Sequence, residues 1–357
     1  MKLTTVPGRS LGGVRFRPVL LAGLVGVVSV AAAVVLLSLS RPDATPSSAP
    51  DSPATEEVPR DGEPPLSEPV GRYVALGDSF TAGPLIPYVD ADRAACLRSS
   101  ANYPAVLGRW LRADRLVDVS CSGADTKDLR AEQLRSVTAP TDLVTVGIGG
   151  NDFSIFATLA QQCSELASTD PTGAPCRVAL RRADGTNPLL AQADRVGRRL
   201  AGALRTVAER APDAVLAVVG YPRILPARDT CASVPLAAGD YAFADRVERR
   251  LNSALRAAAT QADATYVDTY GPSRGHDACA GGAAWVNGQD TRAVRALGFH
   301  PYASGMRATA AAAYRTLTGD HPTASMRERA ERLTSRRPPG TLTLREQRLV
   351  AALLGAD

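Results

Sequence analysis

The sequence predicts an α/β protein in which helices cover both faces of a parallel sheet. From Gly71 onward, short apolar runs of strand length alternate with longer segments of helical periodicity. Turn-forming Gly, Asp and Asn residues follow several of the apolar runs. The chain has 357 residues, which is enough for one sizeable α/β domain with appended segments.

Before this domain, the first forty residues have the pattern of a membrane-targeting segment. Residues 1–18 form a basic segment, and residues 19–40 are apolar and free of charge. The apolar part is about as long as a bilayer crossing, and acidic residues follow it. The positive-inside rule then places residues 1–18 in the cytoplasm and the domain outside the cell. We expect an extracellular domain anchored by this helix, with secretion after cleavage of a long signal segment as the alternative.

A Pro-rich segment separates the apolar part from the domain. Residues 41–70 contain eight prolines with Ser, Asp and Glu between them. Such a composition cannot build a hydrophobic core and predicts a disordered linker that would hold the domain away from the membrane.

Within the domain the pattern predicts five strands and five main helices. The expected strands are Tyr73–Leu76, Leu116–Val119, Leu143–Gly147, Ala214–Val219 and Thr265–Val267. The expected helices are Tyr103–Leu111, Lys127–Leu134, Leu190–Arg210, Tyr241–Ala262 and Tyr302–Leu317. The polar segment between Cys163 and Asn187 is expected to be an irregular excursion tied by a disulfide.

The C-terminal tail, residues 320–357, begins with charged residues and contains "RRPPG". We expect it to be disordered, although its end, "LTLREQRLVAALL", would suit a short amphipathic helix.

All six cysteines follow the apolar segment. An even number of cysteines in an exported domain predicts disulfides, and six cysteines allow 15 pairings. No CxxC pair occurs and the chain has only three histidines, so neither a zinc site nor any other metal site is expected. The net charge is +5, without a dense basic stripe carrying interleaved aromatics, so nucleic acid is not an expected partner.

Four turns with chemically useful residues fall at one end of the predicted sheet. The first three strands are followed by "GDSFTAG", "SCSGAD" and "GIGGND", and "LGFHPYASG" precedes the last helix. In a parallel sheet, ligands bind at the carboxyl ends of the strands. These turns therefore bring Ser79, Gly123, Asn151 and His300 toward one site.

These residue types suit nucleophilic attack on a carbonyl group. A serine hydroxyl needs a nearby base, and histidine has a suitable pKa. The oxyanion that forms needs fixed donors, which the backbone N–H groups of Ser79 and Gly123 and the side chain of Asn151 would supply. Each turn alone has a common structural explanation, since Gly-Asp-Ser makes turns and His beside Pro caps helices. The four together, in this order, are much more specific.

Other polar residues near these turns are expected to be structural. We assign Asp78 and Asp152 to turns and hydrogen-bond networks. His276, beside Cys279, is expected to be structural or part of the cleft rim, and His321 is expected to be solvated.

The chain resembles the SGNH hydrolases, also called the GDSL lipase/esterase family. The four positions that match the family's motifs are Ser79, Gly123, Asn151 and His300. The segments "GYPRILP", "HDAC" and "FHP" resemble its secreted actinobacterial lipase and esterase branch. The match spans about residues 71–319. The resemblance implies a three-layer α/β/α sandwich with a central parallel five-stranded, flavodoxin-like sheet, and carboxylic ester hydrolysis without a metal or cofactor. It also implies three sequential disulfides, Cys96–Cys121, Cys163–Cys176 and Cys231–Cys279.

One position departs from the family pattern. Much of the family has an Asp three residues before the catalytic histidine, and here that position is Leu297. Some members of the branch use a main-chain carbonyl instead. We therefore expect a Ser79–His300 dyad oriented by the backbone carbonyl of Leu297, with Asp277 as the alternative acid.

The expected function is that of a monomeric serine esterase or lipase acting on an ester or lipid substrate. Acyl transfer by the same serine and removal of acetyl groups from a surface polysaccharide are alternatives within enzymes. A non-catalytic domain that binds a cell-envelope component is the alternative of a different class. The four intact site positions speak against that last alternative.

Overall fold

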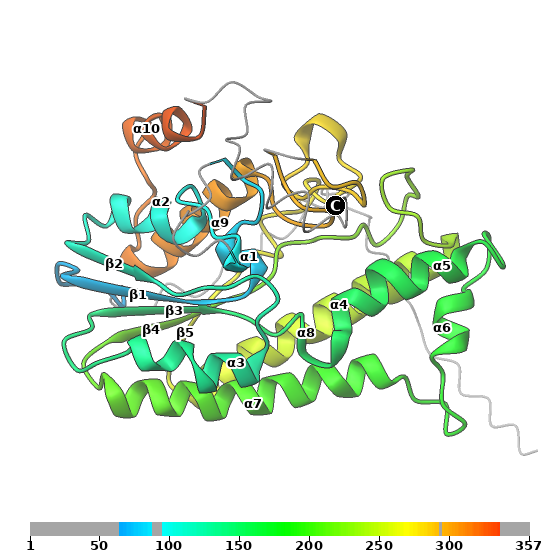
Figure 1. Ribbon diagram of the computed structural model, residues 1–357, viewed down its shortest axis with the longest axis horizontal. Helices are drawn as coiled ribbons and strands as arrows, with labels where there is room; N and C mark the ends of the chain where they lie inside the picture. The colour runs from blue at the N-terminus through cyan, green and yellow to red at the C-terminus, as the bar shows by residue number, and fades with distance from the viewer. Residues whose placement is uncertain (1–63, 88–94, 293–294, 336–357) are drawn as a thin grey trace, which may run out of the picture. The chain divides into compact units, whose positions relative to one another are not determined.

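The computed structural model describes residues 64–87, 95–292 and 295–335, and these contain a five-stranded parallel sheet (Figure 1). The strand order is β2-β1-β3-β4-β5. The strands are β1 (Arg72–Gly77), β2 (Arg115–Asp118), β3 (Leu143–Gly147), β4 (Val215–Val219) and β5 (Thr265–Val267). Helices cover both faces, so the predicted α/β/α sandwich with a five-stranded parallel sheet is confirmed.

The two central strands are buried along almost their whole length. Every residue of β3 is buried, and in β1 all but Arg72 are. Strands covered on both faces read as continuous apolar runs rather than as alternating patterns, which explains why "YVAL" and "LVTVG" were recognisable in the sequence.

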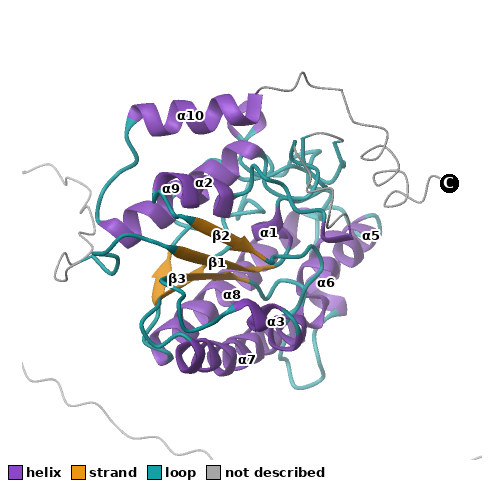
Figure 2. Ribbon diagram, turned by 60° about the vertical axis from the view of Figure 1, so that its left-hand side comes forward, coloured by secondary structure: helices purple, strands orange, loops and turns teal. Residues whose placement is uncertain are grey.

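One face of the sheet is covered by α2 (Tyr103–Trp110) and α9 (Ala303–Thr318), as Figure 2 shows. The other face is covered by α3 (Thr126–Ala131), α7 (Pro188–Arg210) and α8 (Tyr241–Gln261). Helices α7 and α8 pack closely at Gly197, where a Cβ atom would lie 2.7 Å from the Ala254 carbonyl oxygen. A larger residue at Gly197 would push α7 away from α8.

The predicted helix Lys127–Leu134 is two elements in the structure. Helix α3 ends at Ala131, and a 3-10 turn follows at Gln133–Ser136. The Gln133 side chain accepts a hydrogen bond from the Gly77 N–H (2.8 Å) and donates one to the Gly77 carbonyl (3.0 Å). This contact with the end of β1 gives Gln133 a partner that local helical periodicity does not reveal.

The excursion between β3 and α7 contains more helix than the sequence predicted. It includes a 3-10 turn (Asp152–Ser154), α4 (Ile155–Ala157), a π-helical turn (Thr158–Gln162), α5 (Cys163–Ala167) and α6 (Pro175–Ala179). The Cys163–Cys176 disulfide joins α5 to α6, and both of its cysteines are buried in the core on that face of the sheet.

The tail also differs from the prediction. Helix α10 (Ala324–Ser335) lies in the part expected to be disordered. It packs on the domain through Ala330, which is only 4% exposed, and the Trp110 indole donates to the Met326 carbonyl at 3.1 Å. The charged sequence gave no sign of this packing, which depends on α9 and on Trp110 of α2.

The predicted apolar segment, the Pro-rich linker up to residue 63 and the short amphipathic helix predicted near the end of the tail lie outside the described residues. In the part that is described, no helix combines the length and apolar character that crossing a membrane requires.

The six cysteines form three disulfides, Cys96–Cys121, Cys163–Cys176 and Cys231–Cys279. This is the pairing that the family resemblance implies. Two of the bridges tie loops next to the site described below.

Removing a bridge should destabilise the fold more when the bridge closes a longer stretch of chain, with the cost growing as the logarithm of that length. Cys231 and Cys279 are 48 residues apart and Cys163 and Cys176 only 13. We expect replacing both Cys231 and Cys279 by Ser to lower the free energy of unfolding by about 2–4 kcal/mol. Replacing both Cys163 and Cys176 by Ser should lower the free energy of unfolding by about 1 kcal/mol less than that, because a bridge that closes a shorter loop restricts the unfolded chain less. Urea unfolding curves measure both values, and equal stability of parent and variants would contradict the expectation.

Candidate active site

The four predicted turns meet at the carboxyl ends of β1, β2 and β3. The chain leaves β1 toward β2 on one side and later returns to form β3 on the other side. Such a change of direction opens a crevice at the strand ends, where ligands bind in α/β sheets. The loop before α9 closes this end of the sheet, because the Leu297 N–H donates to the Pro84 carbonyl at 3.3 Å.

Ser79 is the first residue of a one-turn helix, α1 (Ser79–Ala82), directly after β1. Asp78 caps this helix by accepting a hydrogen bond from the Phe80 N–H at 2.9 Å. Gly83 ends it with a φ of +72°, a conformation that favours glycine. At the first helical position the Ser79 N–H has no acceptor within the helix, so it can serve a ligand.

His300 lies within hydrogen-bonding distance of Ser79, although 221 residues separate them in the sequence. Its Nε2 is 2.8 Å from the Ser79 Oγ, and its Nδ1 is 2.6 Å from the Gly298 carbonyl oxygen. A carbonyl oxygen can only accept, so Nδ1 carries the proton and Nε2 accepts the serine hydroxyl. This is the arrangement of a nucleophile with its general base.

The expectation that the Leu297 carbonyl orients His300 is wrong. That carbonyl accepts from the His300 backbone N–H and from the Asn287 side chain, both at 3.2 Å. Phe299 adopts a φ of +58°, and this left-handed turn brings the Gly298 carbonyl to the imidazole instead. A main-chain carbonyl is used, but it belongs to the next residue.

The position of His300 favours its neutral form. Burial lowers the pKa of His300 from 6.5 to about 4, and the hydrogen bond to Gly298 offsets only part of this effect. The ring also lies near Phe80, with 5.3 Å between ring centroids. At neutral pH the imidazole is therefore free to accept a proton.

Asp277, the alternative acid, serves a local turn. Its carboxylate accepts the Cys279 N–H at 3.0 Å. In the described part of the chain, the hydrogen bonds of the His300 ring are those to Ser79 and Gly298. The geometry corresponds to a dyad with a carbonyl rather than to a triad with a carboxylate.

The structure brings Asn151 to the loop that carries Gly123. The Asn151 side-chain amide donates one hydrogen to the Ala124 carbonyl at 3.0 Å, which leaves its second N–H for a ligand. Gly123 is exposed and has a φ of +86°, and a Cβ atom there would meet nothing within 4 Å. Glycine is thus favoured by its backbone conformation and not by lack of space.

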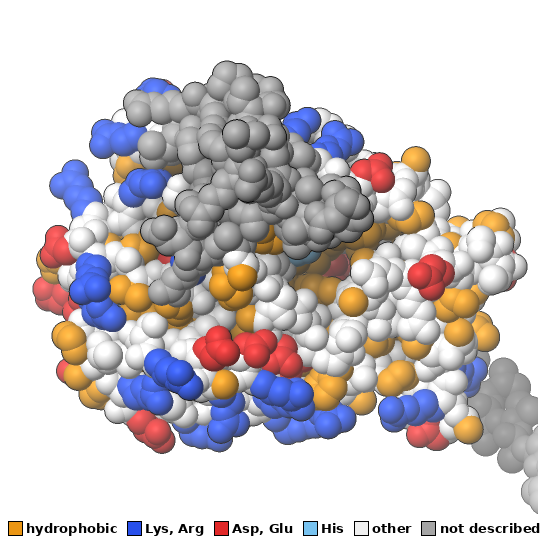
Figure 3. Space-filling model, viewed as in Figure 1, with side chains coloured by type: hydrophobic (Ala, Val, Ile, Leu, Met, Phe, Trp, Pro, Cys, Tyr) orange, Lys and Arg blue, Asp and Glu red, His pale blue; other side chains and the backbone are white. Residues whose placement is uncertain are grey.

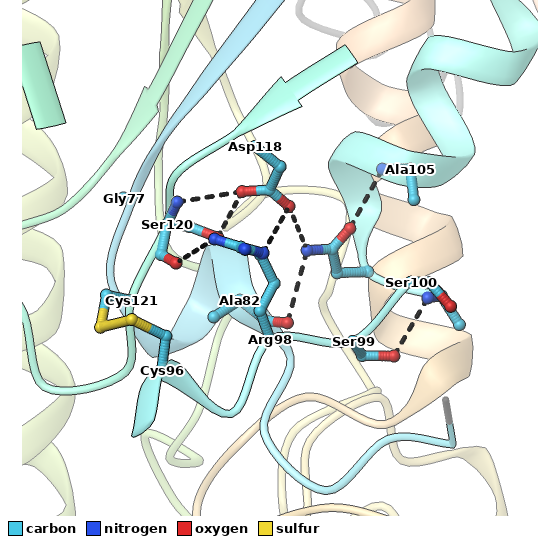
Figure 4. Close-up of polar contacts among 12 residues, drawn as sticks. Gly77, Ala82, Cys96, Arg98, Ser99, Ser100, Ala105, Asp118, Ser120 and Cys121 are labelled. Carbon is cyan, nitrogen blue, oxygen red and sulfur yellow. Dashed lines mark hydrogen bonds and ion pairs between the residues drawn. A yellow bond between two sulfur atoms is a disulfide. The ribbon is translucent and has the colours of Figure 1, made fainter. Parts of the chain in front are cut away.

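Hydrogen bonds, an ion pair and a disulfide hold this loop at the end of β2 (Figure 4). The Cys121 N–H donates to the Gly77 carbonyl at 3.0 Å, and the Cys96–Cys121 disulfide ties the loop to the segment before α2. Asp118 accepts from both the backbone (3.0 Å) and the hydroxyl (2.6 Å) of Ser120, and Arg98 lies 4.0 Å away. Burial raises the pKa of Asp118, so these partners are needed to hold it ionised.

Asp152 anchors the Asn151 loop, in agreement with its expected network role. Its buried carboxylate accepts the Thr126 N–H (2.9 Å) and hydroxyl (2.5 Å) and pairs with Arg199 at 2.8 Å. These contacts tie the loop to α3 and α7. Nothing in the sequence pattern indicated that Thr126 and Arg199 would lie next to the site.

A cavity of about 470 Å³ opens beside Ser79 and His300. Asn151 lines it together with Gln161, Gln289 and Thr291. Most of its wall is apolar, formed by Phe80, Phe156, Ala157, Leu159, Ala160, Ile224, Leu225, Leu297 and Phe299. Figure 3 shows a hollow rimmed by hydrophobic side chains with a histidine visible inside it. The cavity therefore suits an apolar chain attached to a polar reacting group.

Two carboxyl groups also line this cavity, those of Asp78 and Glu248. Glu248 accepts from the backbone N–H groups of Ile224 (2.9 Å) and Leu225 (3.4 Å). Burial raises the pKa of Glu248 well above its usual range, which disfavours a charge in the wall. Neither the motif pattern nor the spacing pointed to this residue.

The remaining histidines lie apart from the cavity. His276 stacks on Trp285 with 4.0 Å between centroids, and its Nδ1 is 2.6 Å from the Ala283 carbonyl oxygen. His321 is exposed, in the segment before α10. Throughout the described ranges, no group of three or more His, Cys, Asp or Glu side chains is placed to hold a metal ion.

Comparison with known proteins agrees with this geometry. The model of the GDSL-like Lipase/Acylhydrolase family matches residues 75–308. Lipase 2 of Streptomyces coelicolor is 39% identical over 267 residues, covering 71% of this chain and 84% of that protein. The crystal structure of phospholipase A1 from Streptomyces albidoflavus NA297 aligns with a TM-score of 0.57 at 26% identity, over 70% of this chain and 99% of that one. The extracellular lipase from Streptomyces rimosus aligns with a TM-score of 0.58 at 27% identity, over 71% and 99%.

The lowered pKa of His300 has a measurable consequence. As a general base the imidazole would act in its neutral form, so activity should be lost only when the pH falls far enough to protonate it. We expect kcat/KM for a soluble ester to stay constant as the pH is lowered from neutral past 6.5. It should fall only as the pH approaches the His300 pKa of about 4. A pH profile measured where the protein stays folded by circular dichroism tests this. An acid limb centred at pH 6.5 or higher would contradict the described burial of His300.

Proposed function

The chain belongs to the GDSL-like lipase/acylhydrolase family and is a carboxylic ester hydrolase, and we propose that Ser79 and His300 perform the hydrolysis as a dyad. One observation carries this proposal. The Ser79 Oγ lies 2.8 Å from the His300 Nε2, while the Gly298 carbonyl holds the opposite ring nitrogen protonated.

In the first half of the reaction, Ser79 Oγ attacks the ester carbonyl carbon and His300 Nε2 takes the hydroxyl proton. The carbonyl oxygen becomes an oxyanion, which the N–H groups of Ser79, Gly123 and the Asn151 side chain stabilise. Collapse of this intermediate breaks the bond to the alcohol oxygen. The leaving alcohol takes the proton from Nε2, and the acyl group remains on Ser79.

In the second half, water replaces the alcohol. Nε2 removes a proton from the water, whose oxygen attacks the acyl carbon and again forms an oxyanion. Collapse returns the proton to Ser79 Oγ and releases the carboxylic acid. The imidazolium that forms in each half has only the Gly298 carbonyl dipole beside it, which stabilises it less than a carboxylate would.

The volume and the apolar lining of the cavity favour a substrate whose acyl chain is longer than acetyl. Its wall is built mainly from Phe, Leu, Ile and Ala side chains, and an acetyl group would leave most of its 470 Å³ unfilled. We therefore favour lipid-like esters over acetylated polysaccharide. The similarity to a phospholipase A1 and to lipases is in line with this choice. Rates on p-nitrophenyl esters of increasing chain length, alongside phospholipid, separate the two alternatives.

In acyl transfer the same acyl-enzyme would form, and an alcohol instead of water would accept the acyl group. An added alcohol competes with water for the acyl group, so the ratio of new ester to free acid distinguishes a transferase from a hydrolase. We propose hydrolysis as the main outcome, because the site opens to solvent on one face (Figure 3).

We also propose that the enzyme acts outside the cell. Three disulfides are typical of proteins in oxidising compartments, and one similar structure is described as an extracellular lipase. Attachment through residues 19–40 remains a prediction from the sequence.

Replacing the nucleophile should abolish hydrolysis and leave the fold intact. We expect Ser79→Ala to lose ester turnover and labelling by a fluorophosphonate probe, because no other hydroxyl contacts His300 Nε2 in the described structure. Ser168→Ala is a matched control, since that serine is exposed and its hydroxyl donates only to the Glu165 carbonyl. Turnover by Ser79→Ala near the parent rate would exclude Ser79 as the nucleophile.

Removing the side-chain oxyanion donor should affect kcat far more than KM. We expect Asn151→Ala to lower kcat by roughly 10²–10³, with KM changed much less, because the donor acts mainly on the transition state. Asn187→Ala is the control. Its side chain caps α7 by accepting from Leu189 at 3.0 Å, so it should cost stability but not kcat. An increase in KM alone would instead make Asn151 a substrate-binding residue.

A further inference from the structure

A tyrosine hydroxyl connects the turn of the nucleophile to the loop of the oxyanion donor. Tyr221 follows β4 and is 2% exposed. Its hydroxyl accepts a hydrogen bond from the Gly150 N–H at 2.7 Å and donates one to the Asp78 carboxylate. Gly150 immediately precedes Asn151, and Asp78 immediately precedes Ser79. The Tyr221 hydroxyl oxygen thus links Asp78, which is next to the proposed nucleophile, to Gly150, which is next to the proposed oxyanion donor.

The direction of these two hydrogen bonds is set by their chemistry. A backbone N–H can only donate, so the Tyr221 oxygen accepts from Gly150 and its own proton is directed at Asp78 Oδ2. The other Asp78 oxygen accepts from the Phe80 N–H in the turn itself. Burial raises the pKa of Asp78 to about 7, and the hydrogen bond from Tyr221 opposes that rise. The hydroxyl therefore also favours the ionised Asp78 that caps the turn.

Tyr221 is itself held by helix α8. Its backbone N–H donates to the Asn252 Oδ1 at 2.8 Å, and its carbonyl accepts from the Asn252 amide at 3.1 Å. The ring makes edge contacts with Phe80 (5.1 Å, 81°) and Phe156 (4.8 Å, 85°). A phenylalanine at 221 would keep the ring contacts and lose only the hydroxyl.

Tyr221 is not among the residues that line the cavity, although Phe80 and Phe156 are. Any influence on the reaction is therefore indirect. A donor that stabilises an oxyanion must sit at hydrogen-bond distance from it, and a shift of about 1 Å can cost about 10²-fold in rate.

We propose that Tyr221 is a positioning residue, whose hydroxyl sets the distance between Ser79 and the Asn151 donor by joining Asp78 to Gly150. This role rests on the proposed function, in which Ser79 attacks the ester and Asn151 stabilises the oxyanion.

The test compares Tyr221→Phe with Tyr73→Phe. Tyr73 is also fully buried and its hydroxyl bonds to Thr145 at 2.8 Å, but it lies within β1, away from the cavity lining. We expect Tyr221→Phe to lower kcat on a soluble ester by about tenfold to a hundredfold with KM nearly unchanged. Tyr73→Phe should keep most of its kcat. Assays run well below the melting temperature of both variants, so that lost stability does not enter the comparison.

A double-mutant cycle with Asn151→Ala shows whether Tyr221 acts through the donor. Once the Asn151 amide is gone, its position no longer matters, so adding Tyr221→Phe should lower kcat only slightly further. A kcat for Tyr221→Phe equal to that of Tyr73→Phe would overturn the proposal. So would a double variant whose decrease in kcat equals the product of the decreases caused by Tyr221→Phe and Asn151→Ala alone. Ser79→Ala measured in parallel keeps the two questions separate, because retained turnover there would refute the proposed function itself.

Discussion

The hydrogen bond from His300 Nδ1 to the Gly298 carbonyl is the contact on which the chemistry of this site depends. It fixes the tautomer that leaves the Nε2 lone pair directed at Ser79, 2.8 Å away. A carbonyl offers a dipole rather than a full charge, so it does not offset the burial that lowers the pKa of His300. In the proposed dyad the base is therefore neutral at neutral pH, and the imidazolium that it would become is less stabilised than in a triad.

That carbonyl is available because the loop before α9 is held in an uncommon conformation. Phe299 has a positive φ, which is unfavourable for a residue with a side chain. Asn287 stabilises the loop by donating to the Leu297 carbonyl at 3.2 Å and to the Asp290 carbonyl at 2.6 Å. Tyr302 in turn donates to the Asn287 side chain at 2.7 Å. Backbone strain next to His300 is thus supported by side chains that do not line the cavity.

The loops after β1, β2 and β3 are each fixed by one aspartate, of which Asp78 and Asp152 are buried and Asp118 is partly buried. Asp78 caps the nucleophile turn, Asp118 holds the segment before Gly123, and Asp152 anchors the loop of Asn151. Burying a carboxylate is costly unless hydrogen bonds and cations compensate, and each of these has at least two partners. The same partners therefore stabilise the fold and hold the proposed catalytic groups at the end of the sheet.

The sequence alone determined the class of fold and predicted the main residues of the candidate site. Buried parallel strands are continuous apolar runs, and the residues that follow them must share one end of the sheet, so Ser79, Gly123, Asn151 and His300 were recognisable from local pattern. Only the tertiary structure decided that Gly298 rather than Leu297 orients His300, that Tyr221 bridges two loops, and that α10 packs on Trp110. The reason is physical. Side-chain periodicity is set by neighbours in the chain, whereas the direction of one carbonyl and the partner of one hydroxyl depend on segments up to hundreds of residues away.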